Sequence, residues 1–271
     1  MELNVIARGH AKAEEDHRRE LCVAGRLLRE RGLVVATEGN VSVRLDAGRI
    51  LVSPRSRSKD AIHPQAIVVT DLEGHKLAGE DNPSTELGMH LLFYRLRPEV
   101  NAVCHAHPPM ACSFAASNTP LNKALLAEMV IALGTVPIAP YGTPGTPALA
   151  EALAPFVPHH DAILLANHGV VTCGVDLLSA FFKMELVEQY ARIVLFTEIL
   201  GKQSLLSASD VEKLLAARTR YGVKLPRTSD ISSIVTSDDA SDRDATERII
   251  MTRAELEALI EEALRNDRAR R

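Results

Sequence analysis

Two histidines at alternating positions follow a short apolar run, and together they could supply two ligands to a metal ion. His105 and His107 come directly after Ala102-Val103-Cys104 and are followed by Pro108-Pro109. Because side chains alternate between the two faces of a β-strand, both imidazoles are expected on the same side of a strand end. Two imidazoles do not complete a metal site, so further ligands must come from elsewhere in the chain.

His168 is the candidate for the third ligand. It follows the apolar stretch 161–166, which is typical of a buried strand, and it precedes Gly169, whose missing Cβ allows close approach of the backbone. Three neutral imidazoles and an open position are what a catalytic Zn²⁺ ion uses, and Mn²⁺, Co²⁺ or Fe²⁺ accept similar ligands. The alternative is that each histidine is an ordinary hydrogen-bonded core residue. The occurrence of all three together favours the metal.

Glu86 is a carboxylate with two possible roles. It falls in the first turn of a helix predicted over 84–94, for which Ser84 is a suitable N-cap. It can act as a proton-transferring base, or it can simply interact with the positive end of the helix dipole. The residues alone leave both roles open. His90 lies one helical turn later without an HExxH pattern, and we interpret it as structural.

Three further segments have the composition of an anion pocket. They contain small or hydroxyl-bearing residues at turns and at a helix start: Gly39-Asn40, the loop Ser53–Ser58, and Ser84-Thr85. Hydroxyl groups, free backbone N–H groups and the helix dipole all favour a bound phosphate or carboxylate. The alternative reading of the third segment is ordinary helix capping.

The elements that must position these residues mix strands and helices without strict alternation. Helices are predicted over 11–31, 84–94, 110–116, 148–153, 177–200 and 211–220. Strands are predicted over 41–45, 49–53, 67–71, 136–139, 161–166 and 170–172, besides the strand that carries His105. Recurring hairpin-like pairs favour an α/β fold of the α+β type, with a central, mainly antiparallel sheet covered by helices in three αβα layers.

We expect residues 1–223 to form one catalytic domain, and 224–271 to form a polar linker and a C-terminal amphipathic helix. The stretch 222–247 is rich in Ser, Asp, Thr and Arg and contains few apolar residues. Thr252 and Glu255 then form a capping box ahead of an apolar stripe. A short isolated helix is marginal in water, so this one is predicted to dock on the core or on a neighbouring subunit.

The composition argues against several other classes of protein. The 271 residues carry a net charge of −4 and no basic stripe, which argues against nucleic acid as a partner. No apolar run approaches the roughly 18 residues that cross a bilayer, and Met1–Arg19 lacks the apolar core of a signal peptide. The four cysteines form no CxxC pair, which is typical of reduced thiols in a cytoplasmic protein.

Six short motifs in order resemble those of the class II aldolase/adducin family, which includes L-fuculose-phosphate aldolase and L-ribulose-5-phosphate 4-epimerase. The resemblance covers roughly residues 15–220. The motifs are Thr-Glu-Gly-Asn-Val-Ser (37–42), Ser-Pro-Arg-Ser (53–56), Pro-Ser-Thr-Glu (83–86), His-Ala-His (105–107), Ala-Pro-Tyr-Gly-Thr-Pro-Gly-Thr (139–146) and Asn-His-Gly (167–169).

The resemblance implies a fold, a function and roles for residues. It implies that His105, His107 and His168 bind Zn²⁺ and that Glu86 is the base; epimerases of the family tend to carry Asp there, which favours an aldolase. The implied reaction is cleavage of a C–C bond in a small ketose, a ketose 1-phosphate in particular, through a metal-stabilised enediolate. The implied assembly is a homotetramer with active sites between subunits. The implied phosphate pocket consists of Gly39, Asn40, Arg55, Ser56, Ser84 and Thr85.

The chain departs from the aldolase pattern at two places. Arg55 replaces a small hydroxyl residue and Ser56 replaces a glycine, and a guanidinium can clamp a carboxylate as well as a phosphate. The family's decarboxylases and oxygenases therefore remain an alternative. The segment 125–134 holds Glu128 where the fuculose-phosphate aldolases carry a proton-donating Tyr, so Glu128 is the candidate donor. A non-enzymatic, adducin-like binding module is the third possibility.

Overall fold

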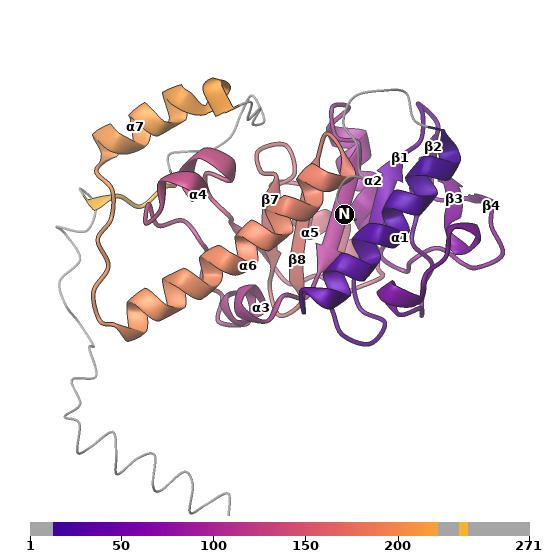
Figure 1. Ribbon diagram of the computed structural model, residues 1–271, viewed down its shortest axis with the longest axis horizontal. Coiled ribbons are helices and arrows are strands. Elements are labelled where there is room, and N and C mark those ends of the chain that lie inside the picture. Colours follow the sequence, from indigo (N-terminus) through magenta and orange to yellow (C-terminus); the bar gives the residue numbers. More distant parts are fainter. Residues whose placement is uncertain (1–12, 222–232, 238–271) are drawn as a thin grey trace, which may run out of the picture. The chain divides into compact units, whose positions relative to one another are not determined.

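An eight-stranded sheet with the strand order β4-β3-β2-β1-β5-β8-β7-β6 forms the centre of the computed structural model, which describes residues 13–221 and 233–237 (Figure 1). The strands are β1 (Asn40–Arg44), β2 (Arg49–Val52), β3 (Val68–Asp71), β4 (Lys76–Ala78), β5 (Ala102–Ala106), β6 (Ile138–Ala139), β7 (Ala162–Leu165) and β8 (Gly169–Gly174). Only β6 and β7 run parallel, and the other neighbours are antiparallel. The predicted, mainly antiparallel sheet is confirmed.

The hairpin β1–β2 forms because its sequence alternates and its turn is closed by a side chain. Asp46 Oδ1 accepts hydrogen bonds from the backbone N–H groups of Gly48 and Arg49, each at 2.9 Å. This turn sets the register in which Val43 lies opposite Leu51. On its other edge β1 pairs with β5, and the register places Asn40 opposite His105.

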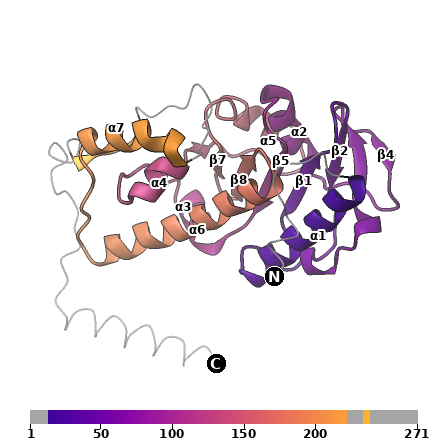
Figure 2. The ribbon, with the colours of Figure 1, turned by 45° about the horizontal axis from the view of Figure 1, so that its top comes forward.

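Helices cover both faces of the sheet, as predicted (Figure 2). The helices α1 (Glu14–Glu30), α3 (Pro109–Ala116) and α6 (Leu177–Ile199) share one apolar cluster with the sheet residues Val41, Cys104 and Val170. On the opposite face, α2 (Leu87–Leu96) and α5 (Pro147–Leu153) pack on a second cluster that includes Val103 and Ile163. Because Val103 lies on the face covered by α2, strand alternation puts His105 on that face as well.

A smaller layer of helices lies beyond one edge of the sheet. α4 (Ala127–Ala132) packs against α7 (Ala208–Ala217), and Val130, Val211 and Ile234 share a cluster there (Figure 1). Ile234 belongs to the predicted linker, and the neighbouring Val235 N–H donates to Asn122 O at 2.8 Å. Three 3₁₀ turns complete the described elements: η2 (Lys59–Ala61), η3 (Pro64–Ala66) and η4 (Arg218–Tyr221).

The start of α2 differs from the prediction. Ser84 is not the N-cap: α2 begins at Leu87 with Glu86 as its N-cap residue, and no side chain caps it. Ser84 Oγ instead accepts from the Glu86 N–H at 3.3 Å, which closes a turn ahead of the helix. The predicted linker beyond 237 and the C-terminal helix lie outside the described residues. Within the described ranges, no helix has the length and apolarity that crossing a membrane demands.

Candidate active site and metal centre

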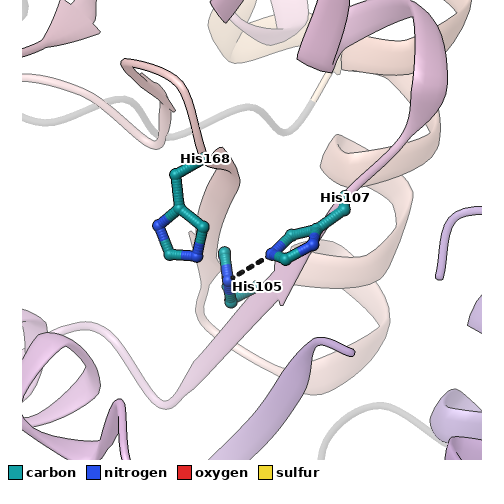
Figure 3. Close-up of side chains that lie close together, drawn as sticks. All are labelled: His105, His107 and His168. Carbon is teal, nitrogen blue, oxygen red and sulfur yellow. Dashed lines mark hydrogen bonds between the residues drawn. The ribbon is translucent and has the colours of Figure 1, made fainter. Parts of the chain in front are cut away.

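The structure brings His105, His107 and His168 together from two segments of the chain that are about sixty residues apart. His105 lies in β5, His107 follows the end of that strand, and His168 lies in the turn between β7 and β8. The three ring centroids are 4.7 to 5.0 Å apart. One nitrogen from each ring lies within 4.8 Å of the others, and Figure 3 shows the rings facing a common point.

A glycine lets His168 approach the other two histidines. A Cβ added at Gly169 would lie 2.6 Å from His107 Cδ2 and 2.7 Å from Ala106 O, both closer than van der Waals contact allows. The preceding residue, Asn167, has a φ of +56°, a left-handed conformation that Asn tolerates better than most residues. The Asn-His-Gly motif therefore turns the chain between two paired strands and presents the imidazole of His168 at their edge.

Nitrogen atoms of the three rings lie close to one another. His105 Nδ1 donates to Val170 O at 2.8 Å, so in the neutral ring Nε2 carries a lone pair. His107 Nε2 lies 3.1 Å from His105 Nε2, and its Nδ1 lies 3.5 Å from Glu38 Oε2. Burial, with the neighbouring His105 and His168, lowers the pKa of His107 to about 4, so this ring is neutral at pH 7. Three imidazole nitrogens this close together could bind a divalent cation in their unprotonated form, and the set suits Zn²⁺, Mn²⁺, Co²⁺ or Fe²⁺.

Glu86 lies directly beside two of the three rings. Its Oε1 is 3.2 Å from His168 Nε2, and its Oε2 is 3.3 Å from His105 Nε2. Burial acts to raise the pKa of Glu86, but the His105 and His168 rings outweigh it and hold this pKa well below its usual range. The carboxylate is therefore ionised and directed at the point where the imidazoles converge.

The candidate anion-pocket segments are joined next to Glu86. Arg55 N–H donates to Asn82 O at 3.1 Å, and an isolated bridge pairs Pro54 with Pro83. Gly39 has a φ of +71°, and a Cβ there would lie 2.8 Å from His105 O. The exposed side chains are those of Arg55, Ser56 and Thr85, whereas Ser84 and Asn40 are buried.

Asn40 has a different environment from the one its predicted role suggests. Its Nδ2 donates to Glu86 Oε2 at 2.8 Å, and its Oδ1 is hydrogen-bonded to His90 Nε2. Both polar ends of this side chain are therefore bonded to protein groups. Its role in binding an anion stays a prediction.

Lys59 is a residue of this region that the sequence reasoning missed. Its Nζ donates to Thr37 O at 3.0 Å and to Arg57 O at 2.9 Å, so the buried ammonium ties the 37–40 segment to the 53–58 loop. Burial lowers its pKa to about 8, although the Glu86 carboxylate acts in the opposite direction. Lys59 is one of several cations in a polar loop, and nothing in its sequence neighbours marks it as buried.

The predicted proton donor is not brought to the site within one chain. Glu128 is exposed in the first turn of α4, which packs against α7. In the part of the chain that the structure describes, no hydrogen bond or ion pair joins Glu128 to Glu86 or to the histidines. Its role as the proton donor stays a prediction.

A cavity of about 380 Å³ is lined by residues of α2 and α5 and of the segments that precede these helices. Thr85, Glu86, Gly145 and Thr146 contribute to its wall, but the three histidines do not. The cavity therefore borders the candidate site without containing the group that would bind a metal.

Comparison with known proteins agrees with these features. The family profile described as "Class II Aldolase and Adducin N-terminal domain" matches residues 19–195. The 5-deoxy-D-ribulose 1-phosphate aldolase of Bacillus thuringiensis serovar kurstaki is 33% identical over 77% of this chain and 98% of its own length. The 3-oxo-tetronate 4-phosphate decarboxylase of Haemophilus influenzae is 38% identical over 62% of this chain and 82% of its own. A solved L-fuculose 1-phosphate aldolase is 32% identical with a TM-score of 0.72, covering 79% of this chain and all of that one.

Proposed function

Because the chain belongs to the class II aldolase and adducin family, we propose that it is a metal-dependent carbon–carbon lyase that cleaves a small ketose, in particular a ketose 1-phosphate. The observation that carries this proposal is the convergence of three imidazoles with Glu86 beside them. A degraded, purely structural relative has no need to keep three imidazoles and a carboxylate grouped in this way. The aldolase relatives support the same class of reaction.

Different residues of the chain would serve different steps of such a reaction. A divalent ion held by His105, His107 and His168 would supply Lewis-acid chemistry at the substrate carbonyl. Glu86 moves a proton at the carbon next to that carbonyl, which it removes when the C–C bond forms and returns when the bond breaks. The segments around Gly39 and Ser84 bind the phosphate. Glu128, supplied across a subunit interface, serves the oxygen of the leaving aldehyde.

A cleavage screen of ketose 1-phosphates with added Zn²⁺, Mn²⁺, Co²⁺ or Fe²⁺ tests this proposal. We expect one bound divalent ion per chain, aldehyde release that EDTA abolishes, and no inactivation by borohydride in the presence of substrate. Full activity in EDTA, or trapping of a Schiff base by borohydride, would overturn the mechanism. Purified protein with neither a bound divalent ion nor a metal-dependent thermal shift would favour an adducin-like binding role.

A decarboxylase is the second candidate, and the environment of Arg55 favours it. Among the described residues its exposed guanidinium has no ion-pair partner, whereas the neighbouring Arg57 is paired with Asp81 at 2.8 Å. Arg55 is therefore available to hold a substrate carboxylate. The relative named as a 3-oxo-tetronate 4-phosphate decarboxylase supports this alternative.

Two arginine variants separate the candidates. Arg55→Ser and the matched control Arg57→Ser would be assayed against ketose 1-phosphates and against phosphorylated 3-oxo acids. Loss of CO₂ release in Arg55→Ser alone would identify the decarboxylase. Ketose 1-phosphate cleavage that Arg55→Ser leaves unchanged would identify the aldolase.

We also propose that the working enzyme is a homotetramer with its sites at subunit interfaces. The exposed position of Glu128, away from the histidines of its own chain, supports this arrangement. Light scattering of the purified protein would give four chains per particle. A fully active monomer would refute it.

A further inference from the structure

A line of buried side chains leads from Glu86 into the protein interior, away from the three metal-site histidines. Asn40 Nδ2 donates to Glu86 Oε2 at 2.8 Å, and Asn40 Oδ1 is hydrogen-bonded to His90 Nε2. His90 Nδ1 lies 2.6 Å from Ser42 Oγ, and Ser42 Oγ lies 2.7 Å from Tyr94 OH. Asn40, Ser42, His90 and Tyr94 are each at most 3% exposed.

Regular secondary structure makes this line possible. Asn40 and Ser42 are two residues apart on β1 and therefore project from the same face of the sheet. His90 and Tyr94 are four residues apart on α2 and therefore lie on one side of that helix. The packing of α2 on this face brings the two pairs into contact, and Glu86 stands at the beginning of the same helix.

The hydrogen atoms in this line can have only one arrangement. Asn40 turns its N–H₂ group toward Glu86, to which its Nδ2 donates, and therefore its Oδ1 toward His90. His90 must then donate from Nε2. Burial lowers the pKa of His90 to about 3, so the ring is neutral and accepts at Nδ1 from the Ser42 hydroxyl, which in turn accepts from Tyr94.

The two oxygens of Glu86 consequently differ. Oε2 accepts the Asn40 hydrogen bond, whereas Oε1 is buried and has no hydrogen-bond partner among the described residues, although His168 Nε2 lies 3.2 Å away. A proton arriving at the carboxylate therefore binds Oε1, because protonation of Oε2 would weaken the hydrogen bond that this oxygen accepts from Asn40.

We propose that His90 is a positioning residue: its Nε2–H tautomer holds the Asn40 amide in one orientation, and that amide fixes Glu86 so that Oε1 carries the transferred proton. The inference rests on the proposed lyase function for its kinetic consequence, but its hydrogen-bond arrangement does not. In the direction of bond formation, Oε1 takes the proton from carbon, and the electron pair of the C–H bond moves into the adjacent carbonyl group. In the direction of cleavage, Oε1 returns that proton to the carbon.

The first test is independent of activity. The holoenzyme with ¹⁵N-labelled histidine would be examined by NMR at pH 7, and the His90 signals assigned by comparison with His90→Gln. We expect a neutral ring that is protonated at Nε2 and unprotonated at Nδ1. A ring protonated at Nδ1 would overturn the proposal, since Asn40 would then have to present its oxygen to Glu86.

The second test measures the proton transfer by itself. Dihydroxyacetone phosphate, the ketone that cleavage of a ketose 1-phosphate releases, would be incubated with the holoenzyme in D₂O, and exchange of its C–H proton followed by NMR. In His90→Leu we expect exchange and kcat to fall roughly 10- to 100-fold, because a misplaced catalytic group costs about that much. KM and bound metal should stay at the wild-type level. His90→Gln, which keeps a donor and an acceptor, should recover most of the rate.

A matched control separates positioning from a general loss of packing. Thr172 is also fully buried, and it donates to Ala180 O at 2.7 Å without any connection to Glu86. Thr172→Val should lower stability and leave the exchange rate unchanged.

The outcomes distinguish the two proposals. Wild-type exchange rates in His90→Leu, or an equal loss of exchange in Thr172→Val, would overturn the positioning role. A wild-type protein that neither cleaves ketose phosphates nor exchanges the proton would refute the proposed function. The tautomer of His90 measured by NMR would then be the remaining test of the proposed hydrogen-bond arrangement.

Discussion

Replacing Gly169 by alanine should displace His107 and weaken the three-histidine site. The new Cβ would stand 2.6 Å from His107 Cδ2 and 2.7 Å from Ala106 O, where ordinary contacts are 3.4 Å or more. The ring or the strand must therefore move by about 0.8 Å to restore normal contact. The backbone has little freedom to do this, because the β5–β8 pairing ends directly beside the clash, at Ala106 opposite Val170, and Gly169 itself pairs with Leu165 of β7.

The size of the effect follows from this displacement. A catalytic group displaced by about 1 Å can cost about 100-fold in rate, and overpacking of a well-packed site costs about 1–3 kcal/mol of stability. For Gly169→Ala we expect metal affinity and kcat to fall by roughly 10- to 100-fold. Metal affinity would be measured by competition with a chromophoric chelator, and the free energy of unfolding by urea titration of the metal-free protein.

Gly48→Ala is the matched control for this prediction. Gly48 has an ordinary φ, and a Cβ there would have only Asp46 Oδ1 nearby, at 4.0 Å. This variant should bind the ion and turn over substrate like the wild type. If Gly169→Ala also bound the ion with wild-type affinity and kept the wild-type kcat, the three-histidine site would not depend on the missing Cβ of Gly169.

Three further predictions concern stability. The pKa of His90 is about 3 in the folded protein and 6.5 in the unfolded chain, so the unfolded chain gains a proton first as the pH falls. The wild type should therefore lose about 2 kcal/mol of its free energy of unfolding between pH 7 and 5, relative to His90→Leu, in urea titrations. The pKa of Lys59 is about 8 in the folded protein and 10.5 in the unfolded chain, so the unfolded chain binds more protons between these pH values. The free energy of unfolding should therefore rise by about 3 kcal/mol between pH 8 and 10.5, and Lys59→Met should remove this rise. Arg97→Met breaks a 2.7 Å ion pair with the buried Asp161, which keeps Lys183 as its second partner, and should cost about 1–3 kcal/mol in the same assay.

Each of these predictions has an outcome that contradicts it. An identical acid dependence in the wild type and His90→Leu would show that folding does not lower the pKa of His90. A Lys59→Met variant that keeps the alkaline rise would place its origin at another group. For the third prediction, Arg19→Met removes an exposed ion pair with Asp16 and should leave the free energy of unfolding nearly unchanged. An equally small effect of Arg97→Met would mean that burial of the ion pair adds nothing to stability.

The sequence predicted best what depends on local pattern. The alternation in 41–45 and 102–106 determines which side chains reach each face, and the structure pairs these strands beside each other. The longest helical pattern became α6, whose first turn has a capping box between Asp176 and Ser179. Three histidines at strand ends were enough to anticipate the cluster, because antiparallel neighbours bring such ends to one edge.

The features that the sequence did not predict depend on contacts between distant segments. Ser84 is a residue type that often caps a helix, but α2 begins only at Leu87. The Glu86 carboxylate, just ahead of the helix, is directed at the histidines. The six-residue helix α4 is too short to stand alone and forms against α7. His90 and His105 look alike in sequence, yet one ring bonds to Asn40 and Ser42 and the other to a backbone carbonyl. Their roles follow from partners about fifty or more residues away.

The strand order also determines when an ion can first bind during folding. The ligands lie at the ends of β5 and β8, and β5 takes its place only by pairing with β1 and with β8, each about sixty residues away in the sequence. Such long-range pairings close large loops and form slowly. Intermediates that contain only the β1–β2 hairpin and the helices should therefore lack the three-histidine site. In refolding followed by stopped flow, cobalt absorbance should accordingly appear in the last kinetic phase, after the helical signal has fully developed.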